Sequence, residues 1–229
     1  MTPASLPVLV ILPAYNEAEV IAEVIADIKR VLDCPIVVVD DGSTDETYQK
    51  VRKAGVPVLR HPINRGAGAA CMTGIAFARL KKHPYVAFMD ADGQHLAEDL
   101  IPMFERLQKT EADLVIGSRF LSENHQIPVI RRFYNQIANI LTNTFCQGRY
   151  SDTQSGFRLL GERAITGIDL YQDDFSYCSE MIIHAEQENL QIVECPISVR
   201  YTPYSLRKGQ DFQVGIKTAF NFLWKLLFR

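Results

Sequence analysis

The feature that most constrains this chain is a series of short apolar runs, each ending in polar or acidic residues and followed by a helical pattern. Pro35–Val39 (PIVVV) is apolar throughout, which is typical of a strand buried on both faces of a parallel sheet. Further strands are expected at Pro7–Pro13, Val56–Leu59, Tyr85–Met89 and Asp113–Ile116. Because helical segments separate these runs, the sequence predicts an α/β fold with a mostly parallel central sheet, right-handed crossovers and helices on both faces.

Helices are expected where apolar residues recur every three to four positions. Before residue 110 the segments with this spacing are Val20–Leu32, Ala67–Lys81 and Glu98–Gln108. Asn16 is expected to cap the first of them, and Ser43 to begin a capping box with Glu46.

The pattern changes after residue 120, where a long amphipathic helix is expected at Arg131–Phe145. A turn at Asp152–Gly156 that leads to a short strand, a helix at Ser179–Gln187 and a strand at Ile192–Arg200 follow. No linker rich in Gly, Ser or Pro divides the chain. We therefore expect one domain over residues 1–210, with a donor half of about 1–120 and an acceptor half of about 121–210, and a separate helix over 211–229.

Composition excludes several classes of protein. Of 229 residues, 47% are apolar and 22% charged, so the chain can bury a core. A net charge of −3 argues against a nucleic-acid partner. The five cysteines are odd in number and none are spaced as C-x-x-C, which disfavours disulfides and zinc sites and favours a reducing compartment.

The C-terminal segment Val214–Arg229 (VGIKTAFNFLWKLLFR) is apolar, aromatic and basic. It is shorter than the ~20 apolar residues that a spanning helix needs. An amphipathic helix lying in a membrane interface, a helix packed in the core or an oligomer, and a truncated membrane region all fit it. We expect a cytoplasmic protein held peripherally at the cytoplasmic face of a membrane, by this helix or by a membrane subunit.

Two carboxylates, Asp90 and Asp92, flank Ala91 after an apolar run. In an extended chain, alternate side chains point the same way, so both would face one ligand. Mg²⁺ takes oxygen ligands, often one or two carboxylates together with substrate phosphates. The alternative is an exposed acidic turn.

Acids also follow the run Pro35–Val39, at Asp40 and Asp41, where a carboxylate can accept hydrogen bonds from a base and a ribose; a helix cap is the alternative. The stretch Asn64–Ala70 (NRGAGAA) opens a helix, and around Gly66 its backbone N–H groups could approach a phosphate or ribose. It matches a dinucleotide-binding turn only partly, because Cys71 stands at the third glycine position.

Basic residues that could bind phosphate are spread over the second half of the chain. They are Arg119, Arg131, Arg132, Arg158, Arg200, Arg207 and Lys208. The planar guanidinium fork suits phosphate oxygens, although a solvated surface charge is the alternative for each of them.

Together, these strings resemble the family 2 glycosyltransferases of GT-A fold. The ordered set is PAYNE (Pro13–Glu17), DDGSTDET (Asp40–Thr47), NRGAGAA, DADGQH, GSRF (Gly117–Phe120) and DTQSGFR (Asp152–Arg158), over roughly residues 7 to 208. The closer likeness is to the polyprenyl-phosphate branch, typified by dolichyl-phosphate mannose and glucose synthases. The resemblance implies a Rossmann-like nucleotide-diphospho-sugar transferase fold.

The resemblance also implies roles for single residues. Donor binding would fall to Pro13, Tyr15, Glu17, Asp40, Asp41, Gly66, Asp90, Ala91 and Asp92. Asp92 with Gln94 would bind Mg²⁺ or Mn²⁺. Arg119 and Arg131 would grip phosphate groups during catalysis. The acceptor side would include Gln154, Ser155, Arg158, Arg200 and Lys208.

The implied reaction is inverting transfer of a hexose from a GDP-mannose or UDP-glucose type of donor to a polyprenyl phosphate. A lipid phosphate is already anionic and needs no strong base, whereas a hydroxyl acceptor would need one, for which Asp152 is the candidate. Transfer to a glycan or other hydroxyl, a non-catalytic nucleotide-sugar-binding subunit and a nicotinamide-dependent oxidoreductase remain alternatives. No Q-x-x-R-W string of processive polysaccharide synthases is present.

Overall fold

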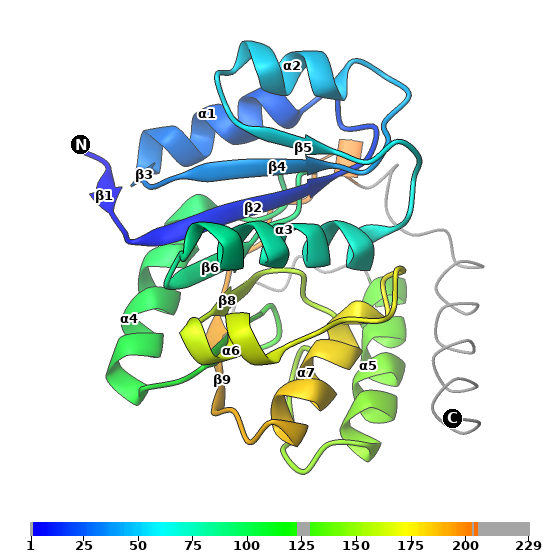
Figure 1. Ribbon diagram of the computed structural model, residues 1–229. Helices are drawn as coiled ribbons and strands as arrows, with labels where there is room; N and C mark the ends of the chain where they lie inside the picture. The colour runs from blue at the N-terminus through cyan, green and yellow to red at the C-terminus, as the bar shows by residue number, and fades with distance from the viewer. Residues whose placement is uncertain (1, 123–128, 203, 206–229) are drawn as a thin grey trace.

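A computed structural model describes residues 2–122, 129–202 and 204–205, with the side chains of 129–131 left out. In this part of the chain a seven-stranded sheet runs in the order β5-β4-β2-β6-β8-β7-β9 (Figure 1). Its strands are β2 (Val8–Ala14), β4 (Ile36–Asp40), β5 (Val58–Arg60), β6 (Tyr85–Phe88), β7 (Leu114–Ser118), β8 (Arg158–Leu160) and β9 (Ile192–Pro196). Two short segments, β1 (Ala4–Ser5) and β3 (Leu32–Asp33), form a separate parallel pair.

Helices cover both faces of the sheet (Figure 1). One face carries α1 (Ile21–Val31), α2 (Thr47–Lys53), the 3-10 turn η1 (Ala97–Asp99) and α4 (Leu100–Thr110); the other carries α3 (Ala67–Lys81), α6 (Glu162–Gly167) and α7 (Tyr177–Gln187). Each face of the sheet has its own hydrophobic core. Alternate residues of β2 contribute to the two cores, because successive side chains of a strand point to opposite faces. The predicted α/β fold with a mostly parallel sheet is confirmed.

The strand β8 departs from the predicted pattern. It lies between β6 and β7 and runs antiparallel to both, with Phe88 and Ile116 each opposite Arg158. Its N-terminal end therefore lies at the edge where the parallel strands have their carboxyl ends. The segment before β8 thus meets the loops after β6 and β7.

Both predicted helix caps are wrong. Asn16 has a φ of 53° and lies outside α1, whose first turn it does not cap. Its side-chain oxygen instead accepts from the N–H of Thr44, while its own N–H donates to the Ser43 hydroxyl. The loops after β2 and β4 are neighbours because these strands pair, and this tertiary contact takes the polar groups that local capping would have used.

The long helix after residue 120 is confirmed as α5 (Val129–Thr144). No helix in the described part of the chain is long and apolar enough to cross a bilayer. Lys208 and the predicted helix over 211–229 lie outside the described residues.

Candidate functional site

The polar clusters noted in the sequence lie at one edge of the sheet. Four of them follow the carboxyl ends of β2, β4, β6 and β7, and a fifth precedes β8, which runs the opposite way. Ligands of open α/β sheets bind outside the carboxyl ends of the strands. The antiparallel insertion of β8 brings the segment 152–158 to that same edge.

The D-x-D element forms a tight turn after β6. Asp92 accepts from the Gln94 backbone N–H at 3.0 Å and from its side-chain amide at 2.7 Å. Asp90 lies directly against Gly156, because a Cβ on that glycine would come within 2.5 Å of Asp90 Oδ1. Only glycine therefore lets the segment before β8 approach the D-x-D turn this closely.

Charge in this turn is unfavourable without a counter-ion. Desolvation raises the pKa of Asp90, although its side chain is 48% exposed, while Arg119 and Arg158 oppose the rise. Desolvation also raises the pKa of Asp92, and the neighbouring charge of Asp90 raises it further. Repulsion between like charges at close range is relieved by a bound cation.

The buried His95 side chain packs under the D-x-D turn and bonds to its backbone. Burial lowers its pKa to about 4, so the ring is neutral at neutral pH. Its Nδ1 accepts from the Asp90 N–H at 3.1 Å, and the ring stacks on Phe157 with centroids 5.0 Å apart. A neutral imidazole is required here because a protonated Nδ1 could not accept that hydrogen bond.

The donor set fits a hard divalent cation. Within the described part of the chain, no group of three His, Cys, Asp or Glu side chains is placed to hold a metal alone. The turn instead offers the Asp92 carboxylate with the Gln94 amide and the Asp90 carboxylate nearby. An ion held by few protein oxygens takes its remaining ligands from phosphates and water, as Mg²⁺ often does.

The predicted nucleoside-binding residues lie around the ends of β2 and β4. Tyr15 is exposed and Pro13 partly so, but Glu17 is buried and its N–H donates to the Thr47 hydroxyl at 2.8 Å. Asp40 is fully buried, accepts from the Ser43 N–H at 3.0 Å and lies 3.2 Å from Arg60 Nε. These contacts hold the Asp40 carboxylate inside the loop that follows β4.

Asp41 organises the glycine-rich turn. Its carboxylate accepts from the backbone N–H of Arg65 at 3.0 Å and of Gly66 at 2.7 Å, and contacts His61 Nδ1 at 2.6 Å. The first turn of α3 is occupied too, because the Gly68 N–H donates to the Asp173 carbonyl at 2.8 Å. These three N–H groups, from the stretch expected to approach a phosphate or ribose, are therefore bonded within the protein.

The ion pair of Arg119 and Asp152 joins the loop after β7 to the segment before β8. Asp152 is fully buried and accepts from Arg119 Nε at 2.7 Å, Nη2 at 2.8 Å and the backbone N–H at 3.0 Å. Burial lowers the pKa of Arg119, but its bonds to Asp152 outweigh that effect and raise the pKa above its usual value. The guanidinium therefore stays charged.

The segment after Asp152 combines one partly exposed side chain with two buried ones. Gln154 is half-buried and donates to the Ser179 hydroxyl at 2.9 Å. Ser155 is buried, and Arg158 donates to the carbonyls of Ser155 at 3.0 Å and Thr153 at 2.8 Å. Arg158 shapes this loop from within the core, and its remaining Nη1 has no hydrogen-bond partner.

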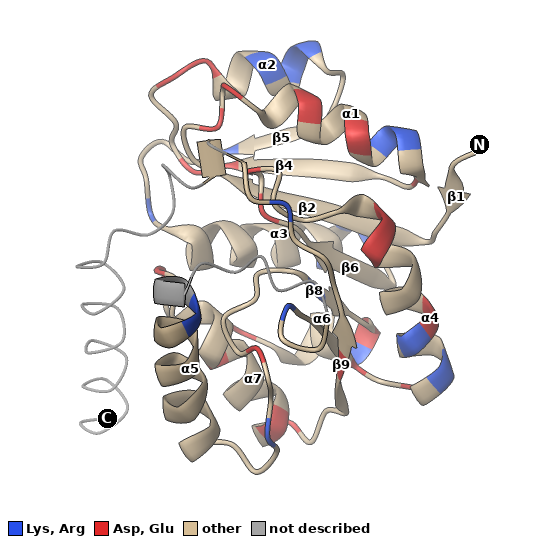
Figure 2. Cartoon of the chain, turned by 180° about the vertical axis from the view of Figure 1, so that it is seen from behind, with Lys and Arg blue, Asp and Glu red and all other residues tan. Residues whose placement is uncertain are grey.

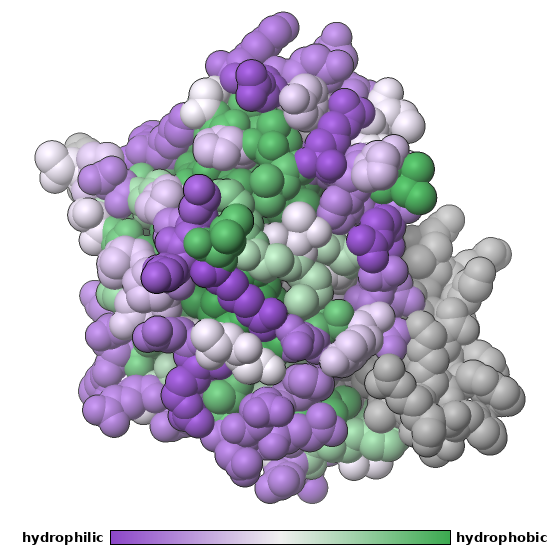
Figure 3. Space-filling model, viewed as in Figure 1, coloured by the Kyte–Doolittle hydropathy of each residue, from purple (hydrophilic) through white to green (hydrophobic). Residues whose placement is uncertain are grey.

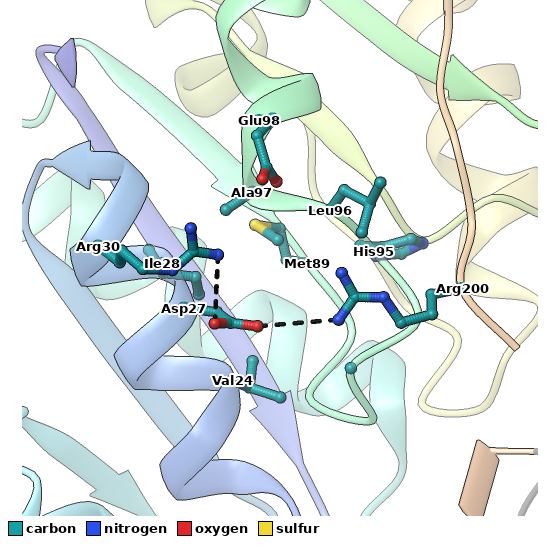
Figure 4. Close-up of a pocket in the computed structure, with 11 residues that line it drawn as sticks. Val24, Asp27, Ile28, Arg30, Met89, His95, Leu96, Ala97, Glu98 and Arg200 are labelled. Carbon is teal, nitrogen blue, oxygen red and sulfur yellow. Dashed lines mark hydrogen bonds and ion pairs between the residues drawn. The ribbon is translucent and has the colours of Figure 1, made fainter. Parts of the chain in front are cut away.

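The other predicted cations are placed differently. The Arg200 N–H donates to the Gln94 carbonyl at 2.9 Å, and its guanidinium lies 4.0 Å from Asp27 of α1 in a small pocket behind the D-x-D turn (Figure 4). It therefore points toward α1, although it was predicted on the acceptor side. Arg131 lies in the first turn of α5, with its side chain outside the described residues, as is all of Lys208.

Sequence reasoning missed a contact between the ends of the described chain. The Tyr204 hydroxyl donates to Glu17 Oε2 at 2.7 Å, and Val199 forms an isolated bridge with His95. The described residues of this segment, 198–202 and 204–205, thus contact both the D-x-D turn and the loop after β2. No local pattern marks this contact, because Tyr204 and Glu17 are 187 positions apart.

Comparison with known proteins agrees with this geometry. The model of the family described as "Glycosyl transferase family 2" matches residues 9–165. An uncharacterised protein of Methanocaldococcus jannaschii is 37% identical over 96% of this chain and 93% of its own length. The UDP-N-acetylglucosamine–dolichyl-phosphate N-acetylglucosaminyltransferase of Methanococcus voltae is 29% identical over 94% of each chain.

The fold is also similar to solved structures. The crystal structure of glucosyl-3-phosphoglycerate synthase from Mycobacterium tuberculosis with Mn²⁺ and uridine-diphosphate-glucose superposes with a TM-score of 0.69. The match covers 96% of this chain and 77% of that one, at 19% sequence identity.

Proposed function

This chain belongs to glycosyl transferase family 2, and we propose that it transfers a hexose, with inversion, from a nucleotide-diphosphate sugar to a polyprenyl phosphate. The proposal depends most on the state of Asp152. Its carboxylate is fully buried and takes three hydrogen bonds from Arg119.

A hydroxyl acceptor must lose a proton to a base within hydrogen-bond reach. Asp152 is the only acid in the segment 151–158, and its full ion pairing disfavours it as that base. A phosphate acceptor is anionic at neutral pH and needs no deprotonation. The name of the Methanococcus voltae relative, a dolichyl-phosphate transferase, supports the same choice.

The donor would bind at the carboxyl ends of β2, β4 and β6. Tyr15 is exposed there and could stack on a base, while Glu17, Asp40 and Asp41 hold the surrounding loops. Asp92 with Gln94 would hold Mg²⁺ or Mn²⁺ on the diphosphate, and the Mn²⁺ and UDP-glucose complex of the Mycobacterium tuberculosis enzyme supports this. When bound, the metal supplies positive charge for the leaving diphosphate.

The protein would then act by positioning and charge. Arg119 is held charged by Asp152, with part of its side chain accessible at the sheet edge, where it could contact a phosphate. Arg131 would add a second cation from α5. In-line attack by a bound phosphate on the anomeric carbon needs little more than alignment and stabilisation of the developing charge.

A polyprenyl acceptor places the reaction at a bilayer. We therefore propose that the protein works peripherally at the cytoplasmic face of a membrane, with the segment 211–229 or a membrane subunit holding it there. In this arrangement the acceptor phosphate reaches the sheet edge from the lipid headgroup region.

The test is a transfer assay with labelled donors and a defined acceptor. GDP-mannose, UDP-glucose and UDP-N-acetylglucosamine are first ranked by thermal shift with and without Mn²⁺, with NAD as the control ligand. The donor that stabilises the protein is then incubated with polyprenyl phosphate, and the products are extracted into chloroform–methanol. Label in the organic phase is expected. Label only in water-soluble glycan would contradict the acceptor, and a shift with NAD alone would contradict the enzyme class.

A further inference from the structure

The helix α5 is amphipathic with its faces reversed relative to an ordinary surface helix. Its inward face is polar: Asn139 and Thr142 are buried. Its outward face is apolar: Phe133, Ile137 and Ile140 are exposed and spaced four and three residues apart, so they lie on one stripe. Ile140 is 67% exposed to solvent.

The inward polar face is fully used. Asn139 donates to the Ser151 carbonyl at 2.6 Å and accepts from the Thr153 N–H at 2.9 Å, and Thr142 shares a hydrogen bond with Ser179 at 2.7 Å. These bonds fix α5 against residues 151–153, beside Asp152 and Gln154. The apolar stripe therefore lies on the side of α5 opposite the proposed acceptor segment, and these bonds hold it there.

The charge pattern of this region is equally unusual. Residues 124–151 contain Arg131, Arg132 and Arg149 and no Asp or Glu, in a chain whose net charge is −3. Figure 2 shows the described part of α5 in tan except for blue near its N-terminal end. The helix α2 is also basic, with Lys50, Arg52 and Lys53, but its surface is hydrophilic and not apolar (Figure 3).

We propose that the outward face of α5 docks on an anionic lipid surface. A helix with an apolar stripe, flanked by cations and free of acids, lies in a membrane interface and gains from both apolar burial and attraction to anionic headgroups. The exposed Arg132 lies at the end of the stripe, and Arg149 is exposed just beyond the C-terminal end of the helix. The docking rests on the proposed function only in that a polyprenyl phosphate acceptor requires a bilayer nearby.

This contact gives α5 a second role. The helix touches the bilayer on one face and residues 151–153 on the other, so docking would orient the acceptor side of the sheet edge toward the headgroups. A lipid phosphate would then reach Arg119 without leaving the membrane surface.

The test compares two exposed aliphatic side chains in the full-length protein. Ile140→Asp places a charge in the stripe, and Leu80→Asp places the same charge at a 77% exposed site on α3. Flotation with vesicles of phosphatidylcholine and phosphatidylglycerol is expected to show at least about tenfold weaker binding for Ile140→Asp and little change for Leu80→Asp. Equal binding of the two variants would overturn the proposal.

Two further measurements identify other occupants of the stripe. If Ile140→Asp lowers the melting temperature of the lipid-free protein by several degrees more than Leu80→Asp, another segment of the chain, such as 214–229, covers the stripe. If it turns a dimer into a monomer in sedimentation, a second copy covers it. Either result would overturn lipid docking.

The failure of this inference can be told apart from failure of the proposed function. Transfer to polyprenyl phosphate is measured both in vesicles and dispersed in detergent. Ile140→Asp is expected to lose at least about tenfold in vesicles and to match the unaltered protein in detergent, where no surface has to be found. Loss of vesicle binding with no transfer to polyprenyl phosphate by either protein in either medium would support the docking surface and contradict the proposed acceptor.

Discussion

We propose that the donor binds to the first half of the chain, up to about residue 120, and the acceptor to the second half, and these two halves place charged groups in opposite ways. In the donor half, Asp90 and Asp92 crowd a turn where their charges repel and desolvation raises the pKa of both carboxyl groups. In the acceptor half, the Asp152 carboxylate is paired within the protein with Arg119, which lies at the boundary between the halves. A bound cation would offset the repulsion in the first arrangement, whereas the two charged groups of the second are already bonded to each other. We infer that the donor half binds through unmet charge and the acceptor half serves as a rigid frame.

The largest effect is expected from Asp92→Asn. This change removes the carboxylate proposed to hold the metal, and transfer should fall by about 10³-fold, or about 4 kcal/mol of transition-state stabilisation. Folding should change little, because an amide removes a raised-pKa carboxyl from a repulsive pair. Initial rates with saturating Mn²⁺ and a thermal melt test both points. Full turnover by the variant would show that Asp92 holds no metal that transfer needs. The proposed contrast between an unmet charge in the donor half and a paired one in the acceptor half would then be wrong.

Removal of metal should reproduce that loss in the unaltered protein. Excess EDTA is expected to abolish transfer and added Mg²⁺ or Mn²⁺ to restore it, while Asp92→Asn gains nothing from either ion. Undiminished turnover in EDTA would show that the repulsion in the D-x-D turn is met in some other way.

Asp152→Asn should act on stability first. Breaking a buried ion pair by removing one partner costs about 3–5 kcal/mol, because the other charge stays buried. Arg119 is mostly buried and held by three bonds to Asp152, so the melting temperature should drop by many degrees. If instead the variant melted normally and only turnover fell, Asp152 would be acting as a base and the acceptor half would not be a passive frame.

The glycine-rich turn of the first half packs against Asp173 of the second half. Gly66→Ala therefore tests how much this contact contributes to stability. Gly66 has a φ of 110°, and a Cβ there would come 2.1 Å from the Asp173 carbonyl oxygen of the acceptor half. Backbone strain alone costs about 1–3 kcal/mol, and the clash adds to it. Gly55→Ala is the matched control, since it has a φ of 67° but open space around it. Equal melting temperatures would mean that the halves separate easily at this point.

The same division describes what the sequence could predict. The strands expected before residue 117 are confirmed, because a buried parallel strand has a strong local pattern. The antiparallel place of β8 was not, since pairing partners are set by tertiary packing. The predicted helix caps at Asn16 and Ser43 are wrong because no local pattern reveals that these two residues bond across neighbouring loops. Arg158 was predicted to face a ligand, yet it is buried among carbonyls, because no local signal separates such an arginine from a surface one.

The smallest effect is expected from Tyr204→Phe, which tests whether the late segment 198–205 helps to form the donor side. The change removes one hydrogen bond to the buried Glu17 carboxylate, worth about 1–2 kcal/mol, and leaves the ring in place. Donor KM should rise several-fold with kcat nearly unchanged, because Glu17 holds the loop that carries Tyr15. Tyr85→Phe is the control, since its hydroxyl also has a hydrogen bond, to Gln108, but at the start of β6 and away from the site edge. If both variants kept the original donor KM, the segment 198–205 would only cover the sheet edge, and the donor site would be built entirely from residues before 120.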